Sequence, residues 1–582
     1  MTHAPPSPAR VLVLDGDMTP ALTVVRSLAQ AGRQVDVASA ESHPIAGYSR
    51  HARQRLRYPD PLRQATEFID WLRAVQSQHA YQLIVPVTER SVMPMFEHRA
   101  QLTDLPLALP DNASLGVALD KHQTLALARK LDIPAPQSLT ISSLDSLGDA
   151  ATALSYPIVV KPARSMGNDS QGHVQLSVSY ALNAAELRAQ TIHALRFGAV
   201  ILQEYFAGQG VGIELIAEHG KIRYAFQHLR LHEVPLSGGG SSLRESVALN
   251  PVLLDASQRL MAALNWHGVA MVEFKWNPVT QTYRLMEING RFWGSLPLAV
   301  AAGADFPAML AELMIDGALQ PRPPARLGIV CRKLSRDLAW HEQVLRQAHD
   351  GLAPPPPRSA IGTSLRQLFS LKHRFDVQSL SDPLPGLIDL GQIAQSYTKR
   401  AWSLWQDRRL RRRQRADWAS GRVTQSITRA RCILFVCYGN INRSALAERV
   451  LRQQIAASPL DIVSAGFHET AGRSADPVMV AIARDHGIDL SDSQSRHLDE
   501  ALLARADIVF VMELAHLRQI QSRYPEAVHK TYLLGMANMT HCPNGEIADP
   551  YGRLPAHYAQ CFDHISACVA PLARACAHQP VN

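Results

Sequence analysis

The stretch CILFVCYGNINRSALAERVL, residues 432–451, decides the fold of the C-terminal part of the chain. Its first six residues are apolar and predict a buried strand, and the pattern after the loop predicts a helix that begins near Arg443. The spacing Cys437-x5-Arg443 therefore places a thiol in a tight loop, at a helix N-terminus and beside a guanidinium. These groups stabilise an anion, as a thiolate that attacks a phosphate monoester requires. Gly439 and Asn440 are the loop residues most able to adopt positive φ.

A structural interpretation of this cysteine is also open, because the spacing arises by chance and a cysteine at a strand end is usually a small buried hydrophobic residue. The rest of the sequence favours the catalytic interpretation. It supplies, in order, SAGFHE from Ser464, the apolar run ARADIVFVME at 504–513, and Asp549-Pro550-Tyr551. Together these motifs resemble the low-molecular-weight protein tyrosine phosphatases over about residues 430–577.

The resemblance implies a role for each matching position. Cys437 would be the nucleophile, Asp549 the general acid for the leaving oxygen, and Tyr551 a wall of the substrate site. Ser444 would hydrogen-bond the thiolate, and Asn440 would brace the loop. The phosphate would be held by Arg443 and by the loop residues Tyr438, Gly439, Asn440, Ile441 and Asn442. The acid follows the nucleophile in the chain, as in this family, and the implied substrate is a phosphotyrosine protein or another aryl phosphate.

Some positions of the module depart from its relatives. The family often has a second loop cysteine just before the arginine, and Asn442 stands there instead, so a protective loop disulfide is not expected. Ile441 stands where arginine-phosphate phosphatases of this fold resemble one another in having threonine, which favours phosphotyrosine over phosphoarginine. Cys561 and Cys568 do not suit a cysteine relay, because their helical spacing separates the Cα atoms by about 10.5 Å, beyond the roughly 7 Å limit for a disulfide.

The N-terminal sequence alternates strands and helices. Apolar runs at Val11–Asp15, 34–38 and Leu83–Val87 are separated by amphipathic stretches, which predicts βαβ units and a parallel sheet. From Asp120 to about residue 325, short strands and helices interleave in an α+β pattern. We therefore predict a multidomain protein of α/β and α+β class.

Two carboxylates in this α+β region lie on predicted neighbouring strands. Because strand side chains alternate, Glu287, Asn289 and Arg291 share a face, and Glu273 lies on the strand before them. Such oxygen donors suit Mg²⁺ beside nucleotide phosphates, and a cation next to them stabilises developing charge. The alternative is a pair of edge-strand acids that face solvent. Lys161 ends an apolar strand just before the segment RSMGNDSQG, where a cation and loop amides can meet phosphates.

This ordered set resembles the ATP-grasp superfamily, in particular carboxylate–amine ligases like carbamoyl-phosphate synthase, from about residue 10 to 325. The resemblance implies ATP and Mg²⁺ as cofactors, with Mn²⁺ as the alternative metal, and a carboxylate and an amine as substrates joined through an acyl phosphate. The implied positions are Lys121 and Lys161 for the ATP phosphates, Gln203 and Glu204 for the adenine hinge, Glu273, Glu287 and Asn289 for the metal, and Arg291 for the acyl phosphate.

Two loops of this region are predicted to be flexible. The family has a glycine-rich loop that closes as a lid over the ATP phosphates. The corresponding segment of this chain, RSMGNDSQG, retains only Gly167 and Gly172, which puts the closure of this lid in doubt. The segment SGGGSSLRES, Ser237–Ser246, is predicted as a loop that covers a substrate carboxylate or phosphate, or alternatively as a mobile connection.

The net charge of +8 is concentrated between Lys399 and Arg431, where Asp407 and Asp417 are the only acidic residues, so no specific nucleic acid binding is expected. A helix is predicted over Ser396–Ser420. It contains Trp402, Trp405, Leu410, Trp418 and the arginines Arg408, Arg409, Arg411, Arg412, Arg413 and Arg415. Such a helix suits an anionic membrane surface or a polyanion. The alternative is a solvated helix between domains whose few apolar residues pack on a neighbour.

At 582 residues, with 46% apolar and 19% charged residues, the chain predicts several globular domains and excludes a disordered protein. The predicted regions are a Rossmann-like lobe at 1–115, the ATP-grasp domain at 116–325, a helical and basic linker region at 326–430, and the phosphatase at 431–582.

The most apolar window, Leu296–Leu319, is interrupted by acidic residues, and the few cysteines do not suggest a disulfide framework. We therefore expect a cytoplasmic protein, with the inner membrane face as a second location for the arginine-rich helix. The sequence predicts a bifunctional ligase and phosphatase. The alternative is an ATP-grasp domain that only senses nucleotide and regulates or scaffolds the phosphatase.

Overall fold

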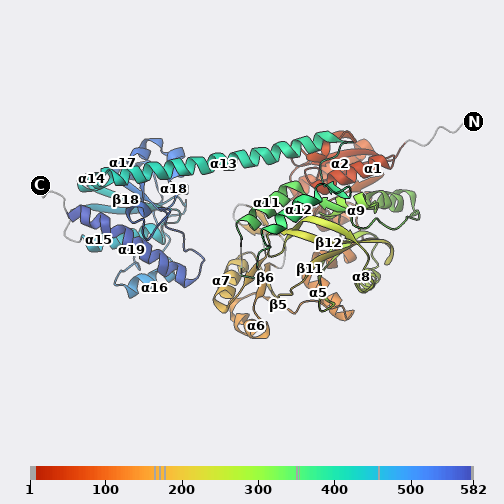
Figure 1. Ribbon diagram of the computed structural model, residues 1–582, viewed down its shortest axis with the longest axis horizontal. Coiled ribbons are helices and arrows are strands. Elements are labelled where there is room, and N and C mark those ends of the chain that lie inside the picture. Colours follow the sequence, from red (N-terminus) through yellow and green to blue (C-terminus); the bar gives the residue numbers. More distant parts are fainter. Residues whose placement is uncertain are drawn as a thin grey trace, which may run out of the picture. The chain divides into compact units, whose positions relative to one another are not determined.

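The computed structural model describes residues 8–162, 166–169, 172–175, 178–348, 351–352, 354–455 and 459–577. The chain divides into two compact units, Met1–Ala394 and Gln395–Asn582, and each is described by itself (Figure 1).

The first unit begins with a parallel four-stranded sheet in the order β3-β2-β1-β4, as the βαβ pattern predicts. Strand β1, one of its two central strands, has three consecutive apolar residues that are all buried, as is usual where helices cover both faces of a parallel sheet. The strands are β1 (Arg10–Val13), β2 (Gln34–Ser39), β3 (Ala52–Arg57) and β4 (Leu83–Val85), and the helices are α1 (Thr19–Gln30), α2 (Ala65–His79) and α3 (Glu89–Glu97).

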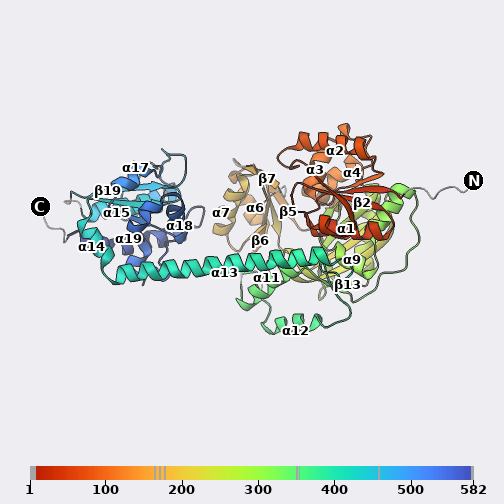
Figure 2. The ribbon, with the colours of Figure 1, turned by 90° about the horizontal axis from the view of Figure 1, so that it is seen from above.

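A seven-stranded sheet in this unit has the order β15-β14-β11-β12-β13-β16-β17, and its strand β13 is labelled in Figure 2. Its strands are β11 (Gln209–Glu218), β12 (Lys221–Val234), β13 (Gly240–Val247), β14 (Gly268–Asn277), β15 (Thr282–Asn289), β16 (Val330–Arg332) and β17 (His373–Phe375). The helices of this part are α4 (Asn112–Leu119), α5 (Lys121–Lys130), α8 (Pro251–Ala263), α9 (Leu296–Ala302), α10 (Phe306–Ala311), α11 (Leu334–Leu345) and α12 (Ser359–Gln367).

Two sequence predictions are wrong in this sheet. Residues 326–394 are not a linker, because β16 and β17 extend the sheet and the segment belongs to the first unit. The segment 237–246 is not mainly a loop, because Gly240–Val247 pairs with β12 as strand β13, leaving only a short connection before it. In both places long-range strand pairing overrides a local glycine or proline signal.

A smaller antiparallel sheet, in the order β5-β10-β6-β9, lies in the same unit. Its strands are β5 (Ser138–Ile141), β6 (Ile158–Pro162), β9 (Ser179–Ala181) and β10 (Val200–Glu204), with helices α6 (Leu147–Ala153) and α7 (Ala184–Leu195). Gly167 and Gly172 lie in a two-stranded hairpin formed by β7 (Met166–Asp169) and β8 (Gly172–Gln175). The rest of the predicted phosphate loop, and the side chains of this hairpin, lie outside the described residues.

Within the described part of the chain, no single helix is long and apolar enough to cross a membrane. One bent pair, Leu296–Ala302 with Phe306–Asp316, passes the test of length and composition when its halves are taken together. Many of the apolar side chains of this pair are buried in the core of the first unit.

The second unit is built on a parallel sheet in the order β19-β18-β20-β21. Alternate residues of β18 face opposite sides: Ile433 and Phe435 pack with α14, α15, α16 and α19, whereas Leu434 and Val436 pack with α17 and α18 (Figure 1). The strands are β18 (Cys432–Cys437), β19 (Asp461–Gly466), β20 (Ile508–Val511) and β21 (Thr531–Leu533). The helices are α14 (Arg422–Arg429), α15 (Arg443–Gln454), α16 (Pro477–Asp485), α17 (Glu500–Arg505), α18 (Leu514–Arg523) and α19 (Pro555–Ala577).

Helix α13 (Pro383–Ala419) is longer than the predicted helix over Ser396–Ser420. It begins at Pro383, because a proline is tolerated in the first turn of a helix, where its missing N–H has no partner to lose. The part of α13 from Gln395 onward and all of α14 belong to the second unit. Val423 and Ile427 of α14 are buried in its core, so this domain begins before residue 431.

Candidate active sites

Asn440 makes several of the hydrogen bonds that hold the loop after β18. Asn440 adopts a left-handed backbone conformation, with φ +53°, whereas Gly439 does not. Of the two loop residues predicted to be most able to adopt positive φ, Asn440 is therefore the one that does so. Its Nδ2 donates to Ser444 Oγ and to Ser464 Oγ, each at 2.9 Å, and its Oδ1 accepts from the N–H of Arg496 at 2.7 Å. The loop is therefore tied to α15 and to β19.

A glycine in the SAGFHE motif lets β19 approach this loop. A Cβ atom on Gly466 would lie 2.7 Å from the carbonyl oxygen of Tyr438 and 2.9 Å from the nitrogen of Asn440. Real side chains do not tolerate such contacts, so this position requires glycine.

Cys437 ends β18 with its thiol inside the loop. Its side chain is buried, its Sγ lies 3.0 Å from Ser444 Oγ, and the N–H of Asn440 donates to it at 3.2 Å. Helix α15 begins at Arg443, as predicted, so the loop leads directly into a helix N-terminus. These groups favour negative charge on the sulfur or on an anion bound beside it.

Arg443 connects the loop to two carboxylates. Its Nη2 donates to Asp549 Oδ2 at 2.7 Å, its Nη1 lies 3.1 Å from Glu513 Oε1, and Nη1 also donates to the carbonyl of Ile547 at 3.0 Å. Burial acts to lower the pKa of Arg443, but Cys437, Asp549 and Glu513 around it raise it overall. Arg443 Nε has no hydrogen-bond partner among the described residues, which leaves a donor for an oxyanion.

Glu513 ends the apolar run 504–513, but no local pattern in the sequence marks its carboxylate as a partner of Arg443. Tyr438 and Tyr551 are about half exposed, so aromatic surface is available near the loop and Asp549. Ile441 and Asn442 lie in the loop as predicted, and both polar atoms of the Asn442 side chain are buried without a partner in the described structure.

The remaining cysteines of this unit are buried and form no disulfide among the described residues. Burial raises the pKa of the Cys561 thiol to about 12, which keeps it protonated. The Sγ atom of Cys568 lies 3.7 Å from that of Cys542, and not beside Cys561. Cys542 lies on a loop, so the helical spacing of Cys561 and Cys568 could not predict this contact.

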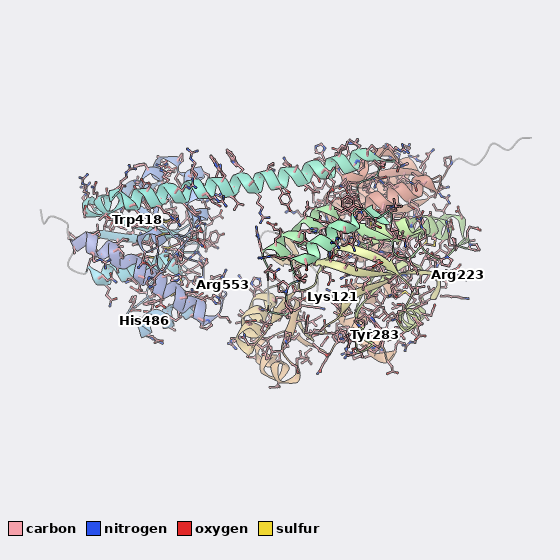
Figure 3. All side chains as sticks on the ribbon, in the orientation of Figure 1. Lys121, Arg223, Tyr283, Trp418, His486 and Arg553 are labelled. Atoms are coloured by element: carbon pink, nitrogen blue, oxygen red, sulfur yellow. The ribbon has the colours of Figure 1, made fainter. Side chains whose placement is uncertain are left out.

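In the first unit, a pocket gathers several of the predicted ligase residues. It is lined by Glu89, Val92, Ala118, Leu119, Lys121, Glu287, Ile288, Asn289, Gly290 and Arg291. Lys121, labelled in Figure 3, lies 4.0 Å from Glu287, and the Nδ2 of Asn289 donates to Glu287 at 3.2 Å. Burial acts to raise the pKa of Glu287, but Lys121, Asn289 and Arg291 outweigh it and lower that pKa. Arg291 itself is paired with Glu89 at 2.8 Å.

Glu273 lies directly opposite Glu287 in the register of β14 and β15, so the two carboxylates share a face. A β-bulge follows immediately in this pair of strands. Glu273 Oε2 accepts from Arg230 Nη2 at 2.5 Å, an ion pair that the sequence did not indicate. Two carboxylates with an adjacent side-chain amide are a donor set that Mg²⁺ takes, so Glu287, Asn289 and Glu273 fit such an ion once Arg230 releases Glu273 or shares it.

Lys161 and Gln203 are brought together on neighbouring strands. Lys161 Nζ donates to Gln203 Oε1 at 2.6 Å, and Gln203 Nε2 donates to Ser138 Oγ at 2.9 Å. Glu204 accepts from the N–H of Gln137 at 3.2 Å. Burial and the charge of Lys121 lower the pKa of Lys161 to about 8, against the pull of Glu287 and Glu273.

Two family models match the chain. The model for "Low molecular weight phosphotyrosine protein phosphatase" matches residues 432–581, and that for "ATP-grasp in the biosynthetic pathway with Ter operon" matches residues 196–336. The probable low molecular weight protein-tyrosine-phosphatase EpsP of Ralstonia nicotianae is 35% identical over 133 residues, which cover 23% of this chain and 87% of that protein.

Two solved structures are also similar. Vibrio vulnificus Wzb in complex with benzylphosphonate has 29% identity and a TM-score of 0.23, covering 25% of this chain and 97% of that chain. Biotin carboxylase from Campylobacter jejuni has 14% identity and a TM-score of 0.45, covering 55% of this chain and 74% of that chain.

If Lys161 holds an ATP phosphate, as the resemblance implies, its lowered pKa predicts a pH dependence for ATP binding. As the pH rises through about 8, Lys161 loses its charge, whereas an ordinary lysine keeps it to above about pH 10. We expect the Kd for ATP, measured by calorimetry between about pH 6.5 and 9.5, to rise above about pH 8. Lys161→Arg, which stays charged, should remove that rise. A Kd of the wild type that is flat to about pH 9.5 would contradict a phosphate-binding role for Lys161.

Proposed function

This chain belongs to the low molecular weight phosphotyrosine protein phosphatase family through its C-terminal domain, which follows an ATP-grasp domain, and we propose specific reactions for both. The layout is that of a bifunctional enzyme with a ligase-type and a phosphatase module. The phosphatase is proposed to act on phosphotyrosine or another aryl phosphate. The ligase is proposed to join a carboxylate to an amine through an acyl phosphate.

The convergence of Arg443 on Cys437 and Asp549 carries the phosphatase proposal. The thiolate of Cys437 attacks the phosphorus atom, an S–P bond forms, and the bond from phosphorus to the aryl oxygen breaks. Asp549 gives its proton to the leaving oxygen, and Arg443 with the loop amides holds the phosphoryl oxygens. Water then attacks the phosphorus of the cysteinyl phosphate while Asp549 takes its proton, and the S–P bond breaks, which releases inorganic phosphate and restores the Cys437 thiolate.

In the ligase module, Lys121 and Lys161 are proposed to hold the ATP phosphates, with Gln203 and Glu204 near the base. The clustering of Lys121 with Glu287, Asn289 and Arg291 in one pocket supports this assignment. A Mg²⁺ or Mn²⁺ ion held by Glu287, Asn289 and Glu273 would supply charge neutralisation for phosphoryl transfer to the substrate carboxylate. Arg291 would then hold the acyl phosphate while the amine attacks.

The exposed part of α13 supports a second location, at the cytoplasmic face of a membrane. Trp402 and Trp405 stack with their ring centroids 4.8 Å apart, and both are about half exposed. Arg409 lies over the Trp405 ring at 5.5 Å, and Arg408 beside it is exposed. We propose that these four residues, the outward face of α13, contact anionic lipid, because aromatic and cationic side chains together suit the headgroup region.

For the ligase module, we expect the full chain to release ADP from ATP only when a suitable carboxylate and amine are added, in a screen of both classes. Glu287→Gln should abolish this release and leave the phosphatase unchanged, because the change removes a metal ligand in a separate core. ADP release that never depends on an added carboxylate or amine would support the nucleotide-sensing alternative. Full ligase activity in Glu287→Gln would contradict the metal assignment.

For the phosphatase, Cys437→Ser should lose turnover but still bind inorganic phosphate, since Arg443 and the loop amides remain. Asp549→Asn should lower kcat/KM for a phosphotyrosine peptide by about 10²-fold or more, and far less for para-nitrophenyl phosphate, whose leaving group scarcely needs a proton. Because Ile441 is apolar, wild type should also prefer phosphotyrosine to phosphoarginine in matched peptides. A clear advantage for phosphoarginine would overturn the substrate assignment.

For the outward face of α13, the double variant Arg408→Gln with Arg409→Gln should weaken binding to vesicles that contain phosphatidylserine by about 1 kcal/mol for each arginine. Binding should also fall with salt, and vesicles of phosphatidylcholine alone are the control. Equal vesicle binding by wild type and variant would leave α13 as a solvated helix.

A further inference from the structure

The arginine-rich part of α13 has two faces, and the inner one docks on the phosphatase domain. Asp407 pairs with Arg518 of α18 at 2.6 Å, and Arg518 also donates to the carbonyl of Ser403 at 3.0 Å. Two turns later, Gln414 accepts from the N–H of Leu533 at 2.8 Å. Trp418, labelled in Figure 3, packs against the core of this domain. The arginine run is therefore not a uniformly free surface.

The inner face also grips the loop that carries Asp549. We define this acid loop as residues 543–549. Arg411 Nη2 donates to Glu546 Oε2 at 2.5 Å, and Nη1 of the same guanidinium donates to the carbonyl of Asn544. Arg415 donates to the carbonyl of Pro543 at 3.2 Å. Two arginines of α13 thus bind three acceptors in the first part of the acid loop.

Glu546 links the contact with Arg411 to the residues around Arg443. Its second oxygen, Oε1, accepts from the N–H of Leu514 at 2.8 Å, which fixes the start of α18. Glu513, the residue before, is one carboxylate partner of Arg443, and Asp549, three residues after Glu546, is the other. Each carboxylate that pairs with Arg443 is therefore close in the chain to a residue of this contact, since Glu513 precedes Leu514 and Asp549 follows Glu546 by three residues.

We infer that Arg411 is a positioning residue for general acid catalysis: by holding Glu546 and Asn544, it sets the place of Asp549 above the phosphate loop. This inference rests on the proposed phosphatase mechanism, in which Asp549 is the acid. The docked part of α13 is then a component of the phosphatase site. The ion pair is only about three-quarters buried, with 27% of each side chain exposed, so its contribution is geometric rather than a large stabilisation.

The test compares two aryl phosphates in the full chain. A phosphotyrosine peptide needs a proton on its leaving oxygen, whereas para-nitrophenyl phosphate scarcely does. Arg411→Gln should lower kcat/KM for the peptide by about 10-fold and change that for para-nitrophenyl phosphate by less than about 2-fold. Partial unfolding would lower both values by one factor, so the ratio of the two values reports the position of the acid and not the amount of folded enzyme.

Arg412→Gln is the matched control, because it removes the same charge from the neighbouring, exposed position and should leave the ratio unchanged. Arg411→Lys, which keeps the charge but not the two-pronged contact, should restore the ratio in part. Equal losses on both substrates, or the same ratio in Arg411→Gln and Arg412→Gln, would overturn the inference. Asp549→Asn, assayed in parallel, separates the failures: if it also spares the ratio, the proposed acid is wrong, and if it alone changes the ratio, only the role of Arg411 is wrong.

Discussion

The second unit depends on one buried cation. Arg443 is almost inaccessible, and an unpaired guanidinium in such a place costs several kcal/mol, so the fold must bring acceptors to it. They come from Glu513 before α18 and from Ile547 and Asp549 in the acid loop. The same charge faces the loop of Cys437. Satisfying one arginine therefore assembles, from distant parts of the sequence, the groups that the proposed phosphatase reaction needs.

In the ligase pocket, cationic side chains likewise pair with carboxylates of the protein. Lys121 and Arg291 offset the carboxylate of Glu287, and Arg230 offsets that of Glu273 on the opposite strand. A metal ion and ATP phosphates would bring further charges of both signs to the same place. These groups would thus replace ion pairs that the protein makes with itself, much as a bound phosphate would replace the contact of Arg443 with Asp549.

Features with a local signal were predictable from the sequence. The apolar run before Cys437 and the start of α15 at Arg443 follow from hydrophobicity and helix pattern, and the βαβ order of the first lobe follows from periodicity. Features made by long-range pairing were not predictable. The contact of Arg230 with Glu273 joins strands far apart in the chain, and β16 joins the central sheet from a segment that we predicted to be part of a linker region. The splitting of the arginine run into two faces likewise required the position of α13.

The central claim is that the phosphate is transferred to Cys437. The most direct measurement mixes the full chain with an aryl phosphate, stops the reaction with acid within the first turnover, and locates the phosphate by peptide mass spectrometry. We expect phosphate on Cys437 and on no other residue, and accumulation of this species in proportion to the enzyme. Turnover that proceeds with no phosphorylated cysteine, or with phosphate on another side chain, would contradict the claim.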